Sequence, residues 1–387
     1  MDSKVFYQWS EPRASLPYRT GVSLHGHTSH SQESLDFIAR MSRSVPFAWQ
    51  LIESRVSRCR ESTGVDVDLE RSFWTPPLTA KMAYDLEAGQ ISGKLYLDPL
   101  VSLSDHDNIE APESLNSMDR TLNVPVSVEW SAEFHKVMFH LGVHNLPRER
   151  AQQFMAEMAA YTAAPRDTRL AELLESLLAV SDVLLVLNHP LWDLYGNGAQ
   201  VHRSATLSFL KENGRFVHAL ELNGLRSWEE NRAVRELAEG WNLPVISGGD
   251  RHGCEPNANL NLTNASTFSE FVSEVRDDSF SRVLMMPQYA EPMPLRILQT
   301  VLDVVREYPG RPPGSRSWDG RVFHPQPDGT YQPLSAMWVN GRPRFFGAIF
   351  GMLRLAERGP MRDALRFALH DEKKVRLALE LVPSAQE

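Results

Sequence analysis

The segment Leu24-His25-Gly26-His27-Thr28-Ser29-His30-Ser31 directly follows a short apolar run that begins at Gly21. His25 and His27 are two residues apart, so on an extended strand end both imidazoles would point to one face and could bind the same cation. An isolated H-x-H pair occurs by chance in many proteins. This pair is informative because similar polar signatures recur along the chain, each near an apolar run typical of a buried strand.

The composition of the 387-residue chain indicates a globular protein of one large domain with extensions, or of two ordinary domains. The net charge of −9, without a long basic run, argues against a protein that coats nucleic acid or binds membrane surfaces. The two cysteines, Cys59 and Cys254, are too few for a disulfide framework. Residues 1–17 show no signal-peptide pattern and no apolar run approaches the roughly 18 residues of a membrane span, so we expect a cytoplasmic protein.

Apolar runs typical of strands alternate with segments of helical periodicity. The predicted strands are 21–24, 100–103, 124–130, 137–143, 183–187, 216–222, 243–246 and 282–286. The predicted helices are 34–60 with a break at Pro46, 76–89, 148–180, 207–213, 227–240 and 268–275. Because few residues separate the runs 124–130 and 137–143, they form either a hairpin or two neighbours joined by a shortened crossover.

Polar signatures stand within or just after most of these strands: Ser104–Asp107, Glu129, His140 and His144, Asn188–Pro190, Glu221 and Asn223, and Ser247–His252. Short strands alternating with helices predict a mostly parallel sheet, and a closed α/β barrel places such residues together at its carboxyl-terminal rim. We therefore predict an α/β protein with a TIM-like (β/α) barrel over residues 18–287 and a helical insert at about 34–95.

The sequence changes character beyond residue 287, where we predict a C-terminal α+β extension over residues 288–387. Its expected elements are a helix at 294–308, a hairpin at 322–339 and helices between 343 and 379, with a Pro/Gly/Arg-rich stretch at 309–320. We expect this extension to pack beside the barrel, where it can overhang the barrel's mouth.

The ordered motifs H-G-H-T-x-x-S, S-D-H-D, V-E-W, F-H-L-G, N-H-P, E-L-N-G and G-G-D-R-H resemble those of the PHP (polymerase and histidinol phosphatase) family over about residues 20–287. The resemblance implies a distorted seven-stranded (β/α) barrel, up to three divalent metals at its rim, and phosphoester hydrolysis. The implied ligands are His25, His27, Glu129 and Asp250 for one metal, His140 and His189 with a bridging Glu129 for a second, and His106 and His252 for a third.

One further ligand is implied less directly. The family pattern has an acidic or histidine side chain shortly after the Ser of its first motif, here Ser31. Glu33 is our choice for this ligand of the third metal, with His30 as the alternative.

Imidazole and carboxylate ligands without thiolate suit Zn²⁺, Mn²⁺ or Fe²⁺, so we expect two or three such ions. A bridging carboxylate holds two cations roughly 3.5–4 Å apart, and the pair would provide a metal-bridging hydroxide that attacks a phosphoester. Asp250 and His252 lie at this predicted reacting centre. Arg251 and His144 are candidates to contact the phosphate or protonate the leaving alcohol, and Asp105 and Asn188 could orient imidazole rings.

Other polar residues have simpler interpretations. Glu221 and Asn223 have either a structural hydrogen-bonding role or contact with substrate. The arginines in the 309–320 stretch and at its end are typical of a solvated loop rather than a phosphate-binding lid. Packing or surface positions are expected for the remaining histidines, His135, His202, His218, His324 and His370.

The leading functional hypothesis is a metal-dependent phosphoesterase acting on a small phosphorylated molecule, with no nucleic-acid or membrane partner. One alternative is an amidohydrolase-like C–N hydrolase, although Glu129 occupies the strand where such enzymes carry a carboxylated lysine. A second alternative is a catalytically inactive metal-binding barrel. The sequence leaves open the substrate, the choice between monoester and diester, the native metal and the oligomeric state.

Overall fold

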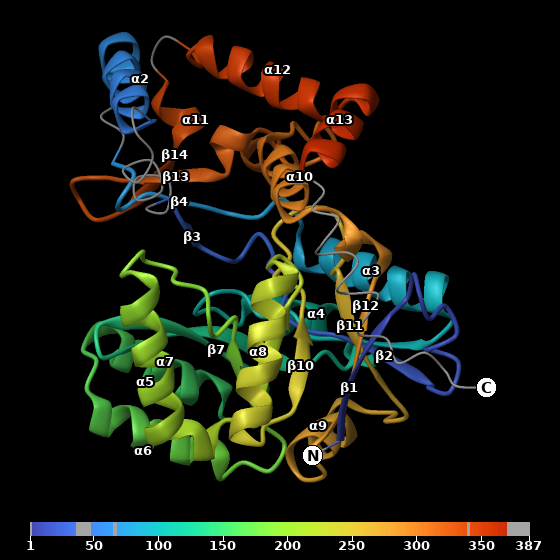
Figure 1. Cartoon of the computed structure of the whole chain (residues 1–387). Helices are drawn as coiled ribbons and strands as arrows, with labels where there is room; N and C mark the ends of the chain where they lie inside the picture. The colour runs from blue at the N-terminus through green and yellow to red at the C-terminus, as the bar shows by residue number, and fades with distance from the viewer. Residues whose placement is uncertain (1, 36–47, 65–67, 339–340, 370–387) are drawn as a thin grey trace.

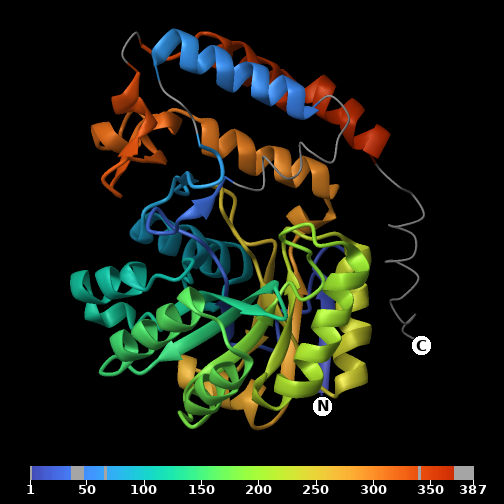
Figure 2. The ribbon, with the colours of Figure 1, turned by 90° about the vertical axis from the view of Figure 1, so that its left-hand side faces the viewer.

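The computed structural model describes residues 2–35, 48–64, 68–338 and 341–369 (Figure 1). Within these ranges the chain is a mixed α/β protein with three sheets, which confirms the predicted α/β class. The two larger sheets and their helices form the main body, and a layer of further helices and short strands lies above it in Figures 1 and 2.

The first sheet has the strand order β1 (Asp2–Tyr7), β12 (Phe280–Met285), β11 (Asn259–Thr263), β2 (Thr20–Ser23) and β5 (Asp98–Val101). Strands β1 and β12 are parallel, as are β2 and β5, whereas β11 is antiparallel to both of its neighbours. Strands β1 and β11 were not predicted from the sequence. With β12, they extend the sheet on one side of β2, the strand that precedes the H-x-H motif.

The second sheet has the order β10 (Val245–Gly248), β9 (Ala219–Asn223), β8 (Leu184–Asn188), β7 (Val137–Leu146) and β6 (Val126–Phe134). Strands β8, β9 and β10 are parallel, while β7 is antiparallel to β6 and β8. Strands β6 and β7 form a hairpin, with His135 and Lys136 at φ 50° and 63° in its tight turn. This turn excludes the crossover alternative, and the prediction of a mostly parallel sheet was wrong for β7 and β11.

No sheet closes on itself within the described ranges, so a seven-stranded barrel is not shown. Two isolated parallel bridges nevertheless join the two large sheets: Gly26 with Arg251, just beyond β2 and β10, and His106 with Glu129, which links the segment after β5 to β6. The predicted ligand motifs therefore lie where the two sheets meet.

Helices flank the main body: α3 (Ala80–Gln90), which continues into a π-helical turn at Ile91–Leu95, α4 (Glu110–Met118), α5 (Ala151–Ala163), α6 (Asp167–Leu178), α7 (Ala199–Asn213), α8 (Trp228–Trp241) and α9 (Phe268–Arg276). Helix α3 begins after Thr79, whose side chain caps it, and not at the predicted Pro76-Pro77. The predicted start of α8 is confirmed, because the Ser227 hydroxyl accepts a hydrogen bond from the Glu230 amide.

Strand β8 shows how the core is divided. All five of its residues are buried, as expected for a strand covered on both faces. Leu185 and Leu187 belong to the core shared with α5, α6 and α7, whereas Leu184 and Val186 join a second core with β2, β10 and α9. This second core lies between the two large sheets, beneath the ends of the strands that carry the polar motifs.

The upper layer combines the insert with the C-terminal extension (Figure 2). Its sheet has the order β14 (Tyr331–Pro333), β13 (Val322–Pro325), β4 (Phe73–Trp74) and β3 (Glu33–Ser34). Its helices are α2 (Ala48–Thr63), α10 (Met293–Val305), α11 (Leu334–Met337), α12 (Phe345–Glu357) and α13 (Gly359–Leu369). The hairpin predicted over 322–339 is shorter, since α11 replaces its second half. The predicted helical residues 36–47 and 370–379 lie outside the described ranges.

Candidate metal centre

Three of the predicted ligand residues lie just after strands in left-handed backbone: His25 after β2, His189 after β8 and Asp250 after β10, with φ of 58°, 27° and 53°. Side chains other than glycine disfavour this region, and such conformations cluster at functional sites. The extended geometry expected at His25 was therefore wrong, because β2 ends at Ser23 and the chain turns. The turn still directs the imidazoles of His25 and His27 to the same place.

The first ligand group consists of His25, His27, Glu129 and Asp250. Glu129 Oε2 lies 2.9 Å from His25 Nε2 and 3.3 Å from His27 Nε2. Asp250 Oδ1 lies 3.7 Å and 3.4 Å from the same two nitrogens. Ligands at about 2.1 Å from a tetrahedral ion are about 3.4 Å apart, so these spacings suit one cation.

The second group shares Glu129 through its other oxygen. Glu129 Oε1 lies 3.2 Å from His140 Nδ1 and 3.2 Å from His189 Nε2. Asn188 donates a hydrogen bond of 2.9 Å to the same oxygen, so it holds the carboxylate rather than an imidazole ring. Both oxygens of Glu129 thus face histidine nitrogens, the arrangement of a carboxylate that bridges two ions.

The third group consists of Glu33, His106 and His252. Glu33 Oε2 lies 3.3 Å from His106 Nε2 and 3.1 Å from His252 Nε2. His252 Nδ1 bonds the backbone oxygen of Asp250, which leaves Nε2 to face Glu33. His30, the alternative ligand, instead pairs with Glu110 at 2.9 Å. The structure brings Glu33, and not His30, into the cluster.

The donor set fits divalent cations. Among the described residues, five buried atoms of this cluster have no hydrogen-bond partner: His25 Nε2, His27 Nε2, His106 Nδ1, Glu129 Oε2 and His140 Nδ1. Buried polar atoms are rarely left without partners unless an ion or water satisfies them. Three overlapping subsets each bring at least three donor atoms within 4.8 Å of one another: His25, His27 and Glu129; His106, Glu129 and His140; and His27, Glu33, His106 and His252. The side chains could therefore hold more than one ion.

The electrostatics of the cluster couple its carboxylates to its imidazoles. Burial raises the pKa of a carboxyl group, but neighbouring imidazoles hold the pKa of Glu129 well below its usual value. The pKa of Glu33 is lowered in the same way by His252 and His106. Burial lowers the pKa of His140 to about 4, although Glu129 opposes this shift. Burial lowers the pKa of His25, but Glu129 and Glu221 raise it well above its usual value, and Glu33 and Glu129 likewise raise the pKa of His106 to about 10. Because metals bind ionised carboxylates and neutral imidazoles, a cation would have to displace these protons.

Arg251 and His144, the two residues predicted to contact phosphate, both bond buried protein groups. Arg251 is 4% exposed, and it donates to Glu87 Oε1 at 2.9 Å and to the oxygen of Gly253. His144 is 1% exposed, with Nδ1 2.9 Å from Ser102 Oγ, and burial lowers its pKa to about 3. His144 is enclosed by protein groups, whereas Arg251 keeps one buried nitrogen, Nη2, without a hydrogen-bond partner. Contact of either side chain with a phosphate or a leaving alcohol stays a prediction.

Asp105 also differs from its predicted role. Its carboxylate accepts bonds from the amide and the hydroxyl of Thr28, at 2.5 and 2.7 Å, and so holds the turn after His27 rather than a ring. Two tryptophans that were not predicted as site residues lie beside the cluster. The Trp74 ring lies 5.9 Å from that of His252, and the Trp192 ring lies 5.0 Å from that of His189. No sequence pattern marked either position.

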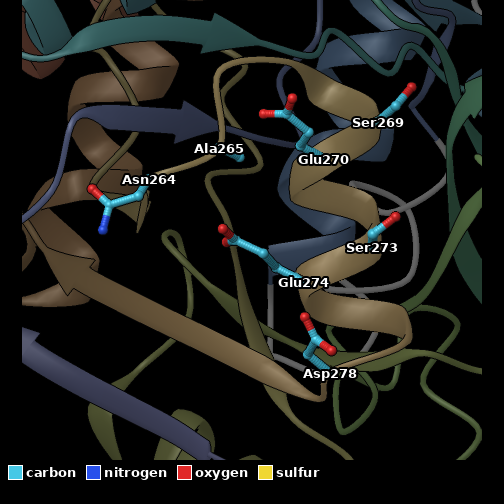
Figure 3. Close-up of a pocket in the computed structure, with 7 residues that line it drawn as sticks. All are labelled: Asn264, Ala265, Ser269, Glu270, Ser273, Glu274 and Asp278. Carbon is cyan, nitrogen blue, oxygen red and sulfur yellow. The ribbon is translucent and has the colours of Figure 1, made fainter.

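One cavity lies away from the ligand cluster, and another lies beside it. A surface hollow of about 430 Å³ is lined by residues of helix α9 and the segment before it, and Figure 3 shows Glu270 and Glu274 pointing from α9 toward the segment of Asn264. It contains no predicted site residue. A smaller cavity of about 100 Å³ lies between the 249–258 loop and helix α10, with Arg251 and His252 on its wall.

Comparison with known proteins places the chain among distant neighbours only. No known protein-family model and no curated protein matches it. Similar solved structures include a protein from Bifidobacterium adolescentis described provisionally as a metal-dependent phosphoesterase, with 14% identity and a TM-score of 0.32 over 52% of this chain and 91% of that one. An amidohydrolase from Chromobacterium violaceum, with bound sulfate and no metal, has 16% identity and a TM-score of 0.32 over 60% of this chain and 87% of that one.

A third structure, PsfC from Pseudomonas syringae, has 18% identity and a TM-score of 0.36 over 57% of this chain and 87% of that one. Similarities this weak do not identify a substrate or a reaction. Among the described residues, no helix has the length and apolar character needed to cross a bilayer. The fold and the site thus define an α/β protein with a candidate centre for divalent metals.

Proposed function

We propose that this chain is a metal-dependent phosphoesterase that hydrolyses a small phosphorylated molecule. The observation that carries the proposal is the convergence of histidines and carboxylates, from segments far apart in the sequence, around inward-facing atoms that lack hydrogen bonds. Buried polar side chains that only stabilised the fold would be expected to form hydrogen bonds with one another through all of these atoms.

In this proposal Glu129 is the central ligand. It holds one ion with His25, His27 and Asp250, and a second ion with His140 and His189. The third ion would be held by Glu33, His106 and His252. When bound, these ions would lower the pKa of a water molecule and withdraw charge from the phosphoryl oxygens.

The chain's own residues keep this centre ordered and shielded. His25, His27 and Glu129 are at most 1% exposed, which strengthens electrostatic attraction by excluding water. The rings of Trp74 and Trp192, from separate segments, lie beside those of His252 and His189.

The proposal implies a distorted PHP-type ring of seven strands in the order β2, β5, β6, β7, β8, β9, β10. Two features support it: the pairings within each large sheet, and the bridges Gly26–Arg251 and His106–Glu129 between the sheets. We also propose that the ring and its helices span residues 18–287. The extension over 288–387 then packs on the ring together with the insert, whose strand β4 pairs with β13.

The test is an assay of full-length protein that has been treated with chelator and reloaded with Zn²⁺ or Mn²⁺. We expect phosphate release from 4-nitrophenyl phosphate, bis(4-nitrophenyl) phosphate or a panel of phosphorylated metabolites, and loss of this activity in Asp250→Asn. Turnover of aryl amides without phosphate release would instead favour a C–N hydrolase. Metal binding without any turnover would favour an inactive metal-binding barrel.

A further inference from the structure

Strand β9 supplies none of the predicted metal ligands, yet two of its side chains bond three ligand residues. We propose that Glu221 and Asn223 are positioning residues of the metal centre, which fix the ring nitrogen that His25 presents and the oxygen that Asp250 presents. This inference rests on the proposed metal centre and assigns a role to a motif that the sequence left open.

Glu221 connects two ligand segments. It is 1% exposed; its Oε1 pairs with His25 Nδ1, and its Oε2 accepts a bond of 2.8 Å from the backbone N–H of His189. An ionised carboxylate only accepts hydrogen bonds, so His25 Nδ1 must carry the proton. The other ring nitrogen, Nε2, is then the one directed at Glu129, 2.9 Å away.

The Glu221 carboxylate also stabilises the backbone conformation of the turns at His25 and His189. His25 and His189 both lie in left-handed conformations, and Glu221 bonds the ring of the first and the amide of the second. Conformations of this kind persist only where surrounding contacts enforce them. Glu221 therefore holds together the two turns that deliver ligands to different ions.

Asn223 performs the corresponding task for Asp250. Its Oδ1 accepts a bond of 2.8 Å from the Leu225 amide, which fixes the orientation of the side-chain amide. Its Nδ2 consequently faces two carboxylates, Glu221 Oε2 at 3.0 Å and Asp250 Oδ2 at 3.1 Å. Asp250 Oδ1 is left to face His27 Nε2 at 3.4 Å.

The neighbouring strand leaves space for this arrangement. Gly248 of β10 pairs with Asn223 in the parallel register. A Cβ atom at Gly248 would overlap the Glu221 carboxylate, so only glycine fits at this position. The first glycine of the G-G-D-R-H motif thus serves the positioning residue, while Asp250 follows two residues later.

Two isosteric substitutions separate positioning from packing. Glu221→Gln keeps the shape but turns an amide N–H₂ toward one of the three donors that Glu221 now accepts from. Asn223→Asp keeps the shape but replaces the donor between two carboxylates with a third negative charge. Glu274→Gln is the matched control, because Glu274, on helix α9, accepts a bond from Thr263 Oγ1 of β11 and bonds no predicted ligand.

The experiment is calorimetric titration of Zn²⁺ into chelator-treated full-length protein, with the visible spectrum of the Co²⁺-loaded protein as a second readout. We expect Glu221→Gln and Asn223→Asp to bind the tightest ion about 10–100-fold more weakly and to change the Co²⁺ spectrum, while Glu274→Gln behaves as wild type. Urea unfolding of the metal-free proteins is measured in parallel.

Wild-type affinity in both variants would overturn the inference. Lower stability of the metal-free variants with unchanged Zn²⁺ affinity would likewise overturn it, because that result assigns a purely structural role. A wild-type protein that binds no Zn²⁺, Mn²⁺ or Fe²⁺ would instead contradict the proposed function, so the two failures are distinguishable.

Discussion

Glu33 Oε2 lies 3.1 Å from His252 Nε2, which joins the first residue of β3 to the last predicted ligand motif. Glu33 also pairs with Trp74 across β3 and β4, and β4 pairs in turn with β13 of the C-terminal extension. The third ligand group is therefore built partly from the upper layer of the molecule. We therefore predict that the proposed third ion can be separated from the other two by mutation.

Replacing Glu33 should remove the third ion selectively. We expect Glu33→Gln to lower the metal content by about one equivalent, because the carboxylate is the one anionic group that faces both His106 Nε2 and His252 Nε2 at close range. His30→Gln should leave the metal content unchanged, since His30 pairs with Glu110. Elemental analysis of both variants, reloaded under the same conditions, makes the comparison, and equal losses would refute this assignment.

Weakening the contact between β4 and β13 should loosen the third group. The rings of Phe73 and Phe323 are stacked 5.0 Å apart across this pairing. We expect Phe323→Ala to lower the free energy of unfolding by about 1–2 kcal/mol and to weaken binding of the third ion. Met352→Ala, at a side chain 64% exposed on α12, is the control. Thermal unfolding and metal titration measure the two effects, and full retention of the third ion would contradict the coupling.

Chelation should destabilise the wild-type protein. Ions that bind only the folded state stabilise it by about 2.7 kcal/mol at a concentration one hundred times Kd. We expect EDTA to lower the unfolding midpoint and added Zn²⁺ to restore it. The unfolding midpoint of Glu129→Gln should change far less with EDTA or Zn²⁺, because Glu129 faces histidines of two ligand groups. A midpoint that is the same with and without chelator in wild type would count against the centre.

His218 provides a pH prediction away from the predicted ligands. Burial, assisted by the charge of Arg276, lowers the pKa of His218 to about 4, and its Nδ1 accepts a bond from the Leu185 amide. The unfolded chain binds a proton near pH 6.5, so this histidine stabilises the fold above that pH and loses the contribution as pH falls toward 4. The full effect is at most about 3 kcal/mol.

The measurement is urea unfolding of chelator-treated wild type and His218→Gln between pH 4 and 7.5. We expect the stability advantage of wild type to shrink steadily below pH 6.5. An advantage that stays constant across this range would show that His218 does not titrate as described.

The segments that converge on Glu129 could be recognised in the sequence because each carries a local signal. His189 and Asp250 follow short apolar strands, and such strand ends can be recognised without knowing the sheet order. The fold around them was harder to predict. In β11 the alternation of Asn and Leu spans only five residues, and its polar members Asn259 and Asn261 are buried, where they bond Leu222 and Ser247. The two-residue strands β3 and β4 are too short for any periodicity.

The roles of individual polar residues depended on long-range partners. Nothing in the local sequence shows that Glu87 of helix α3 pairs with Arg251, or that Glu221 meets His25. For the same reason the sequence did not show that buried groups bond Arg251 and His144. Positioning residues are set by tertiary contacts, whereas ligand motifs are set by strand ends.

The central claim is that Glu129 joins ligands from distant segments around divalent ions. Anomalous diffraction from crystals of the Zn²⁺- or Mn²⁺-loaded full-length protein tests it most directly. We predict one peak among His25, His27, Glu129 and Asp250 and a second between Glu129, His140 and His189. Peaks confined to other parts of the surface, with none beside Glu129, would contradict the account.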